Sequence, residues 1–522
     1  MTTPTPINPF AGMDVRSLID LQATARGDHP CLIWEPFDAE GRTWSYAQFA
    51  VAVRRFAAGL QARGVKPADR VLVHLDNCPE SVIAWLGCAY AGAVAVTTNA
   101  KSSADEISYF ASHSGAVGGI TQPKFAALVR DSAPGLGWLV VTSDDNGAPA
   151  EADVSSYEPF SALDGDPAAL TARPHDPMAH FAIQYTSGTT ARPKAVLWTH
   201  ANFLWGAKMC ALHEDLRPDD VHLVTLPLFH TNAQSYSVAA ALWAGATMVL
   251  QPKFSASRFW PVSLKHGCTW ASMVPFCLKA IAEQPKPERH SYRFWGNGVC
   301  EPPTDALFGV KTIGWWGMTE TITQGTVGSP HLKDAPMSMG RPSPGYRIHV
   351  LDDEGRPVKP GETGDLHVEG WRGVSLFLEY ANDPEATAKA YTEGGLFITG
   401  DRVRLGEDGY LYFADRSKDM LKVGGENVAA SEIERVVGSV AGVRECAVVG
   451  RRHPMLDEVP VAFVIPVDPA DTGLAERVLE ACAATLASFK RPHEVRLVPE
   501  LPRSTLEKIA KAELRAVLVA EG

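Results

Sequence analysis

A hydroxyl-rich turn follows an apolar run and has the residue types needed to hold a phosphate. Residues 184–196 read Gln-Tyr-Thr-Ser-Gly-Thr-Thr-Ala-Arg-Pro-Lys-Ala-Val, and the turn itself comprises Thr186, Ser187, Gly188, Thr189 and Thr190. Hydroxyl and backbone N–H donors in such a turn converge on one anion, and Lys194 adds a positive charge. We therefore predict a phosphate cradle. It is not a Walker A loop, because GxxxxGK[ST] does not occur, and a turn of this kind taken alone is more typical of an ordinary surface loop.

Four further segments carry residues suited to nucleotide chemistry. They are Gly-Trp-Trp-Gly-Met-Thr-Glu at 314–320, Thr-Gly-Asp at 399–401, Asp-Arg-Ser-Lys-Asp-Met-Leu-Lys-Val-Gly-Gly-Glu-Asn at 415–427 and Leu-Pro-Arg-Ser-Thr-Leu-Glu-Lys at 501–508. Together with the turn they resemble, in order and spacing, the motifs of the adenylate-forming superfamily, which comprises acyl-CoA synthetases, nonribosomal peptide adenylation domains and luciferases. The resemblance covers most of the chain.

The resemblance implies an ATP-dependent acyl-CoA synthetase that uses ATP, Mg²⁺ and coenzyme A. A carboxylate is a poor electrophile, so it first attacks the α-phosphorus of ATP and expels pyrophosphate, and a thiol then displaces AMP. The implied partners are a small-molecule carboxylic acid, ATP and CoA. Two alternatives stay open: a stand-alone adenylation enzyme that loads a carrier-protein thiol, and a nucleotide-dependent binding or regulatory protein without turnover.

The family motifs imply roles for individual residues. By resemblance, the turn at 186–190 holds the β- and γ-phosphates with help from Lys194, and Thr319 contacts the α-phosphate. Glu320 and Thr186 are the implied Mg²⁺ ligands, because Mg²⁺ prefers oxygen ligands and bridges phosphates. Without the motif, Glu320 would be interpreted as a solvated carboxylate.

The nucleoside of ATP has implied contacts of its own. Trp316 presents a flat face to the adenine where the family usually has Tyr or Phe, which keeps the stacking but removes a hydroxyl. Asp401 accepts hydrogen bonds from the ribose, and Arg416 approaches the same sugar. The other residues implied to bind the nucleotide are Gly296, Asn297, Gly298, Trp315, Gly317, Met318 and Phe413.

Lys508 is the implied catalytic lysine for adenylation, because a cation that bridges the carboxylate and the α-phosphate stabilises charge as it moves. Lys511 is a less favoured substitute. The chain departs from the family pattern at Glu507, where Gly usually precedes the lysine, and at Ala191 and Ala195, where Gly is common. Both alanines must adopt ordinary backbone angles. These departures put the rate of adenylation in question.

One cleft must bind pyrophosphate first and a long thiol later, which a domain rotation makes possible. Lys418 occupies the family's hinge position. After rotation Lys508 leaves, and the residues implied to face the cleft are Lys422, Gly424, Gly425 and Asn427. The glycines leave room for a pantetheine arm, although they fit a turn before a helix equally well.

His230, in the segment Leu-Pro-Leu-Phe-His-Thr-Asn at 226–232, resembles the family residue that gates the carboxylate, and it completes the implied catalytic set with Lys508, Glu320 and Thr186. Candidates for the acid pocket are Phe229, Trp205, Asn232, Trp295, Trp315 and Met318. This lining predicts a bulky, largely apolar acid, and it lacks an acidic residue for an amino group. Residues 295–303 and 314–320 also resemble the carnitine-type CoA ligase branch, which is a weaker indication.

These residues lie between alternating helix and strand patterns. Ser45 and Gln48 form a capping-box pattern before a helix that ends at Gly64, and strands are expected at 70–75 and 93–97 around a helix at 79–91. A helix at 237–244 followed by a strand at 246–250 repeats the unit, which predicts helix-covered, mostly parallel sheets. We predict an α/β fold with an AMP-binding body at 1–415, including a β-rich subdomain, and a small, mobile α+β lid at 416–522 that carries the catalytic lysine.

Composition and charge exclude several functional classes. The 522 residues are 45% hydrophobic and 21% charged, which is typical of a soluble globular protein. The net charge is 48 − 60 = −12, and residues 416–522 carry 15 − 16 = −1 of it, so the body carries −11 and nucleic-acid binding is disfavoured. Nine cysteines without a CxxC pair predict neither disulfides nor a zinc site. With no signal-peptide pattern and no apolar run long enough for a membrane span, we expect a cytoplasmic protein, and a homodimer is one assembly that the sequence allows.

Overall fold

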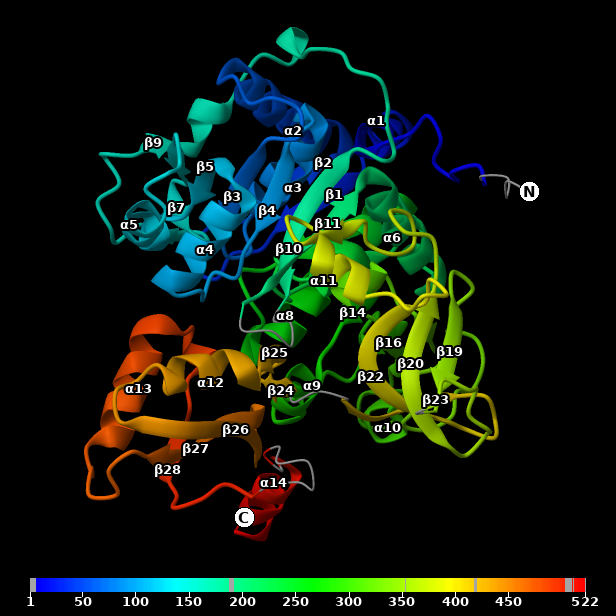
Figure 1. Cartoon of the computed structure of the whole chain (residues 1–522). Coiled ribbons are helices and arrows are strands. Elements are labelled where there is room, and N and C mark those ends of the chain that lie inside the picture. Colours follow the sequence, from blue (N-terminus) through cyan, green and yellow to red (C-terminus); the bar gives the residue numbers. More distant parts are fainter. Residues whose placement is uncertain are drawn as a thin grey trace.

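The computed structural model describes residues 6–186, 192–352, 354–416, 420–502, 509 and 511–521. In this part of the chain, two helix-covered sheets and a smaller antiparallel sheet form a large body, and a fourth sheet belongs to a lid beside it (Figure 1).

The first sheet of the body is mainly parallel and carries the phosphate-cradle segment. Strands β10 and β11 pair antiparallel, so Thr186 at the end of β10 lies opposite Lys194 at the start of β11. On the other side β10 pairs in parallel with β4. The strand order is β21 (Glu379–Tyr380), β11 (Lys194–Thr199), β10 (His180–Thr186), β4 (Val94–Thr97), β3 (Arg70–His74), β5 (Ala116–Thr121), β6 (Leu139–Val141) and β9 (Glu158–Pro159).

The second sheet brings the aromatic motif to the same region. Strands β15 and β16 run in parallel, so Asn297 and Trp316, their last residues, lie at the same edge. The strand order is β18 (Arg341–Pro342), β17 (Thr326–Val327), β16 (Lys311–Trp316), β15 (Phe294–Asn297), β14 (Trp270–Ser272), β12 (Val221–Val224), β13 (Thr247–Leu250), β1 (Pro30–Trp34) and β2 (Arg42–Ser45).

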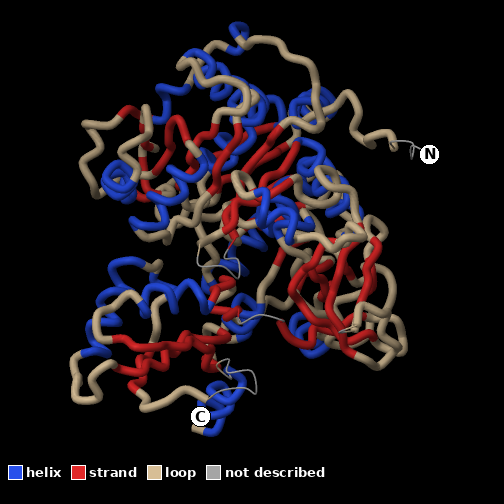
Figure 2. The backbone as a smooth tube through the Cα atoms, viewed as in Figure 1, coloured by secondary structure: helices blue, strands red, loops and turns tan. Residues whose placement is uncertain are grey.

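Helices cover the faces of both sheets, as Figure 2 shows in blue. The predicted capping box is present, since Ser45 and Gln48 bond reciprocally at the start of α2. α3 ends at Gly92, whose φ of 92° is a left-handed conformation that suits glycine. The body helices are α1 (Val15–Ala25), α2 (Tyr46–Ala62), α3 (Pro79–Ala91), α4 (Ala104–Ser114), α5 (Pro123–Ser132), α6 (His200–His213), α7 (Ala240–Ala244), α8 (Ala256–His266), α9 (Pro275–Ala282), α10 (Pro302–Phe308) and α11 (Pro384–Lys389).

The predicted β-rich subdomain is an antiparallel sheet in the order β19 (Arg347–Leu351), β20 (Thr363–Glu369), β22 (Phe397–Leu405) and β23 (Leu411–Arg416). The lid sheet contains β25 (Glu426–Ala429), β24 (Met420–Val423), β27 (Asp457–Pro466), β26 (Val443–His453) and β28 (Glu494–Leu497). Its helices are α12 (Ala430–Gly438), α13 (Leu474–Thr485), η5 (Ser488–Lys490) and α14 (Lys511–Ala520). The smaller sheet ends with β23 at Arg416, and the first lid strand, β24, begins at Met420.

The predicted α/β fold class is confirmed, with one local difference. In the helix expected at 237–244, residues 237–239 belong to a π-helix, η3 (Asn232–Ala239), and residues 240–244 form α7. Residues 144–177 contain short elements: β7 (Asp144–Asp145), β8 (Ala148–Pro149), β9, η1 (Phe160–Leu163) and η2 (Pro167–Ala169). All nine cysteines are free thiols. Among the described residues, every helix is too short or too polar to cross a membrane.

Candidate active site

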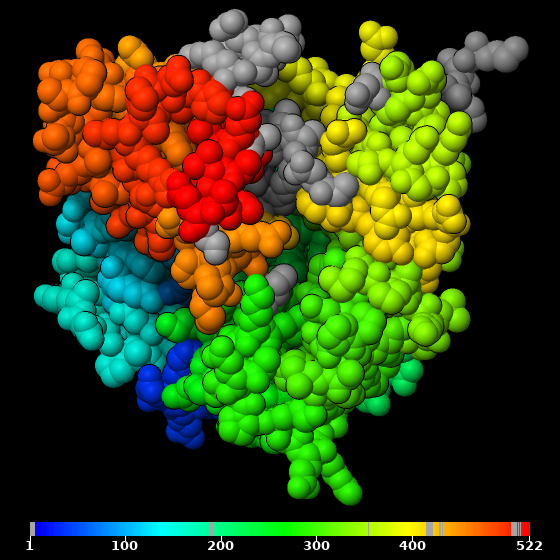
Figure 3. Space-filling model, turned by 90° about the horizontal axis from the view of Figure 1, so that it is seen from below, coloured from blue at the N-terminus to red at the C-terminus, as the bar shows by residue number. Residues whose placement is uncertain are grey.

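A cleft of about 1510 Å³ lies where the two large sheets, the smaller sheet and the lid meet. The ends of β10, β15 and β16, the segment after β12, strand β22 and the lid hairpin β24–β25 line it. In Figure 3 the lid, in orange and red, adjoins the body beside this region. The carboxyl ends of parallel strands are the usual ligand site in open α/β sheets.

Most residues that the motifs single out line this cleft. They are Thr186, Lys194, His230, Asn297, Gly298, Trp315, Trp316, Gly317, Met318, Thr319, Glu320, Asp401, Phe413, Lys422, Gly424 and Gly425. Six of the predicted residues lie outside the described residues, namely Ser187, Gly188, Thr189, Thr190, Lys418 and Lys508, as do Ala191, Glu507 and the side chains of Arg416 and Asn427. The structure therefore brings together residues of the body and of the lid, from Thr186 to Gly425.

Glu320, in η4 (Thr319–Thr321), is a buried carboxylate at the base of the cleft, with only 4% of its surface exposed. The Tyr380 hydroxyl donates a hydrogen bond to its Oε1 at 2.9 Å. Lys194 Nζ lies 4.4 Å from the centre of the Tyr380 ring. Burial raises the pKa of Glu320, although the Tyr380 hydrogen bond and Lys194 act in the opposite direction. Because burial disfavours the ionised form of this carboxyl group, a cation bound beside it would stabilise the carboxylate.

The backbone around Glu320 is held in a fixed shape. Trp198 Nε1 donates to the Thr319 carbonyl at 3.0 Å, and the Thr231 hydroxyl lies 3.1 Å from that of Thr319. Ile322, which is fully buried, has a φ of 66°. A β-branched residue is strained in this region, and such strain is concentrated at functional sites.

Trp316 and Asp401 meet directly across the cleft. The indole Nε1 of Trp316, at the end of β16, donates to Asp401 Oδ2 on β22 at 2.8 Å. Gly325 lies against the indole, because a Cβ on this glycine would come within 2.7 Å of the ring. The tryptophan thus replaces the family's hydroxyl with an N–H donor that orients the predicted ribose-binding carboxylate.

Trp315 forms one wall of the cleft and is fixed from several sides. Its ring stacks on Trp270 with 6.1 Å between centroids, and Tyr236 packs edge-on at 5.4 Å. Gly296 lies behind it, where a Cβ would come within 1.6 Å of Trp315 Cη2. Gly296 therefore makes room for the indole. It was predicted to bind the nucleotide, but it is not among the residues that line the cleft.

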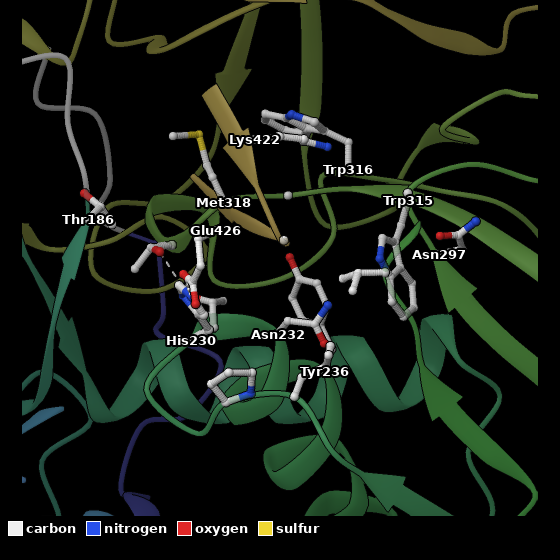
Figure 4. Close-up of a pocket in the computed structure, with 18 of the residues that line it drawn as sticks. Thr186, His230, Asn232, Tyr236, Asn297, Trp315, Trp316, Met318, Lys422 and Glu426 are labelled. Atoms are coloured by element: carbon white, nitrogen blue, oxygen red, sulfur yellow. Dashed lines mark hydrogen bonds and ion pairs between the residues drawn. The ribbon is translucent and has the colours of Figure 1, made fainter. Parts of the chain in front are cut away.

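His230 bridges the body and the lid. Its Nε2 lies 2.7 Å from the carboxylate of Glu426, at the start of β25 (Figure 4). Burial by itself raises the pKa of Glu426, but His230, followed by Lys101 and Lys490, outweighs this effect and the pKa lies below its ordinary value. The ionised carboxylate is therefore the favoured form at the mouth of the cleft.

The acid-pocket candidates divide into two groups. Phe229, Asn232 and Met318 line the cleft together with Trp315. Trp295 instead lies fully buried in an aromatic cluster, 5.3 Å from Tyr292 between ring centroids, and so is not part of the wall. Trp205 likewise packs edge-on against Tyr346 and is not among the lining residues. Both were predicted from residue type alone, and tertiary packing decides their place.

Three residues of the site escaped prediction. Glu426 stands inside the Gly-Gly-Glu-Asn motif, between residues that were singled out, so the motif itself contained the signal. Tyr236 and Tyr380 carry no local signal, because each reaches the cleft through a sheet or helix contact distant in sequence.

Comparisons with known proteins agree with this geometry. The model of the AMP-binding enzyme family matches residues 19–380, and that of the AMP-binding enzyme C-terminal domain matches residues 432–508. The chain belongs to the AMP-binding enzyme family. The predicted adenylate-forming superfamily and the AMP-forming acyl-CoA ligase class are thereby confirmed, and the comparisons do not support the carrier-protein alternative.

Relatives of this AMP-binding enzyme align over nearly its whole length. A crotonobetaine/carnitine–CoA ligase from Salmonella enteritidis PT4 is 33% identical over 519 residues, which cover 97% of this chain and 99% of the relative. One from Escherichia coli O139:H28 is 33% identical over 523 residues with the same coverage.

Solved structures of other family members superimpose on most of this chain. A double mutant of o-succinylbenzoate CoA synthetase (MenE) from Bacillus subtilis, bound with its product analogue OSB-NCoA, gives a TM-score of 0.82 at 26% identity and covers 96% of this chain and 98% of that one. ATP-bound MatB from Rhodopseudomonas palustris gives 0.69 at 26% identity, covering 97% and 99%.

Proposed function

We propose that this acyl-CoA ligase activates a bulky, largely apolar carboxylic acid as an acyl-AMP in the cleft and transfers the acyl group to CoA there. The observation that carries the proposal is the meeting of Glu320, Thr319 and the Trp316–Asp401 pair beside the lid hairpin. The residues proposed to bind the phosphates, the ribose and the thiol thus lie in one cleft. We expect the enzyme to work in the cytoplasm, where ATP and CoA are supplied.

For adenylation, the acid's carboxylate oxygen attacks the α-phosphorus and pyrophosphate leaves. Thr319 is placed to bind the α-phosphate, and Asp401, oriented by Trp316, to bind the ribose. Glu320 and Thr186 fit a Mg²⁺ ion, because Tyr380 bonds Oε1 of the buried Glu320 carboxylate and a hard cation takes oxygen ligands. Bound Mg²⁺ supplies neutralising charge for the phosphates. We assign the bridging cation of this step to Lys508.

We propose that the lid in this structure is oriented for the second step. The place of Lys422, Gly424 and Gly425 in the lining of the cleft supports this proposal. In this step the thiol sulfur attacks the acyl carbon and AMP leaves with the electron pair of the broken bond. We propose that rotation at Lys418 exchanges this arrangement for the one that presents Lys508.

The His230–Glu426 contact links the gate to the lid. Glu426 belongs to the lid, and in this orientation its carboxylate lies beside His230. We propose that Glu426 holds the imidazole at the lid while the thiol enters, and that rotation releases His230 toward the acid.

The acid's class follows from the wall of the cleft. Trp315, Tyr236, Phe229 and Met318 present apolar surface, which favours a bulky apolar acyl group. A quaternary-ammonium acid is the second candidate, favoured by the relatives' named substrates and by the aromatic faces of Trp315 and Tyr236, which also attract such cations.

ATP/pyrophosphate exchange with paired acids tests the proposal. Each pair consists of a trimethylammonium acid and its isosteric tert-butyl analogue. Aliphatic, aryl and polycyclic acids are assayed in the same way, and the CoA products are identified by mass spectrometry. A lower KM for the tert-butyl analogue is expected. Preference for the ammonium partner selects the second candidate, and absence of exchange with every acid while ATP still binds contradicts ligase activity.

A further inference from the structure

A buried cluster of three charged residues joins the lid to the body away from the cleft. Lys490, in η5, places its Nζ against the carboxylates of Glu106 on α4 and Glu432 on α12, the latter at 3.0 Å. The exposed fractions are 6% for Lys490, 4% for Glu106 and 3% for Glu432. Burying charges is costly unless they are paired and hydrogen-bonded, so this contact is a specific element of the interface.

The body side of the contact is the capping box of α4. The Glu106 Oε2 accepts the backbone N–H of Ser103 at 2.8 Å, while Oε1 faces Lys490. The Ser103 hydroxyl in turn donates to the Thr485 carbonyl at the end of α13 in the lid. Ser103 and Glu106 therefore each make one hydrogen bond within the capping box and a second one to the lid. The N-terminal position on α4 also favours the Glu106 carboxylate.

Each half of the contact is satisfied when the two domains separate. Glu432 and Lys490 both belong to the lid, so their ion pair travels with it. Glu106 keeps the Ser103 N–H. Burial lowers the pKa of Lys490, but Glu432 and Glu106 outweigh that effect and raise it, so the ammonium stays charged. An ion pair that forms and breaks at low cost on either side suits a moving interface.

We propose that the Glu106–Lys490 contact is a latch that holds the lid in the thioester-forming orientation, which makes Lys490 and Glu106 positioning residues for the second half-reaction. The inference rests on the proposed two-step function. Neither residue lines the cleft, so the latch acts on lid orientation and not on the reacting atoms.

Glu106→Gln tests the latch with the least disturbance. Glutamine retains the amide oxygen that accepts the Ser103 N–H, so the capping box survives while the charge facing Lys490 is lost. The two half-reactions are measured separately in single turnovers: acyl-AMP formation by quenched flow, and conversion of preformed acyl-AMP with CoA. We expect the second rate to fall about tenfold, the change typical of one lost charge-assisted hydrogen bond, and the first to stay within about twofold.

A substitution on the lid side and a matched control complete the experiment. Lys490→Met removes the ammonium on the lid side and slows the second step. It adds little to the loss in Glu106→Gln, because both changes remove the same contact. Asp471→Asn, which removes an exposed ion pair with Arg477 inside the lid, leaves both rates unchanged.

Three outcomes overturn the latch: an unchanged second rate in Glu106→Gln, equal loss in both half-reactions, or fully additive losses when Glu106→Gln and Lys490→Met are combined. A parent enzyme that forms no acyl-CoA with any acid contradicts the proposed function instead, so the two failures are distinguishable.

Discussion

Gly296→Ala tests whether the wall of the acid site is as rigid as its contacts indicate. Gly296 lies at the end of β15, directly behind Trp315. An alanine Cβ there would stand 1.6 Å from Cη2, 2.2 Å from Cζ2 and 2.4 Å from Cζ3 of the indole. The six-membered ring of Trp315 must therefore move before this residue can be accommodated.

The size of the effect follows from these distances. Ordinary van der Waals contact begins at 3.4 Å, so the indole must retreat by 3.4 − 1.6 = 1.8 Å. Trp270 stacks on one face and Tyr236 abuts it edge-on, which leaves the cleft as the open direction. Overpacking typically costs about 1–3 kcal/mol, and we expect about 2–3 kcal/mol here because two aromatic neighbours resist.

Two measurements follow the displacement. The melting temperature should fall by about 2–4 °C, since large domains shift little per kcal/mol. The KM for the acid in ATP/pyrophosphate exchange should rise about tenfold or more, because the displaced ring occupies acid volume, while the KM for ATP stays near its parent value. Adding Trp315→Phe, which removes the clashing ring atoms, should recover most of the stability.

Gly298→Ala is the matched control. It adds the same methyl group two residues along, at a glycine that lines the cleft but has no atom within 4 Å of the added Cβ. We expect it to change stability by less than about 0.5 kcal/mol. If Gly296→Ala behaves like Gly298→Ala in both measurements, the assignment of Trp315 as a fixed wall is wrong.

Three further substitutions probe the nucleotide and lid contacts. Trp316→Phe keeps the stacking face but removes the donor to Asp401, so the KM for ATP should rise about tenfold with the acid's KM unchanged, and an unchanged ATP KM contradicts that role. Glu320→Gln should abolish most exchange activity yet raise the melting temperature of the free enzyme at pH 7. Burial raises the pKa of Glu320, so ionisation of this carboxyl costs stability as the pH rises through that pKa. The stability advantage of the Gln variant should therefore vanish as the pH falls toward 4.5. Glu426→Gln should slow thioester formation several-fold and spare adenylation. The pKa of Glu426 lies below its ordinary 4.5, so the stabilisation from the His230 contact is present above pH 4.5 and is lost as the pH falls through the lowered pKa. A pH series of the second half-reaction measures this loss.

Short motifs predicted most of the residues that line the cleft. Trp316 and Thr186 are the last residues of β16 and β10, and the carboxyl ends of such strands are the usual ligand site in open α/β sheets. The departure at Ala195 is accommodated as expected, since this residue lies within β11 and pairs with Tyr185 in an ordinary strand. Local chemistry and local backbone geometry agree at these positions, which is why the sequence alone was informative.

Contacts between distant segments could not be predicted in this way. Tyr380 reaches Glu320 across 60 residues, and Lys490 reaches Glu106 across 384. Neither contact belongs to a periodic pattern or a motif. Trp295 and Trp315 show the same limit within one region, because both are tryptophans inside neighbouring parallel strands, yet packing buries the first completely and leaves the second in the wall of the cleft. Side-chain type predicted apolar character but not the direction in which each ring faces.

The contact between the body and the lid depends on local charge pairs and not on the net charge of each domain. The body carries −11 and the lid −1, so net charge does not draw them together. Their interface instead pairs opposite charges locally, with lid Glu426 on His230 and lid Lys490 on Glu106. Fields from distant exposed charges are screened beyond about 8–10 Å, whereas buried pairs are screened much less. Lid orientation in this structure is therefore stabilised by a few matched contacts. We propose that the orientation that presents Lys508 draws its matching charge from the phosphates of ATP.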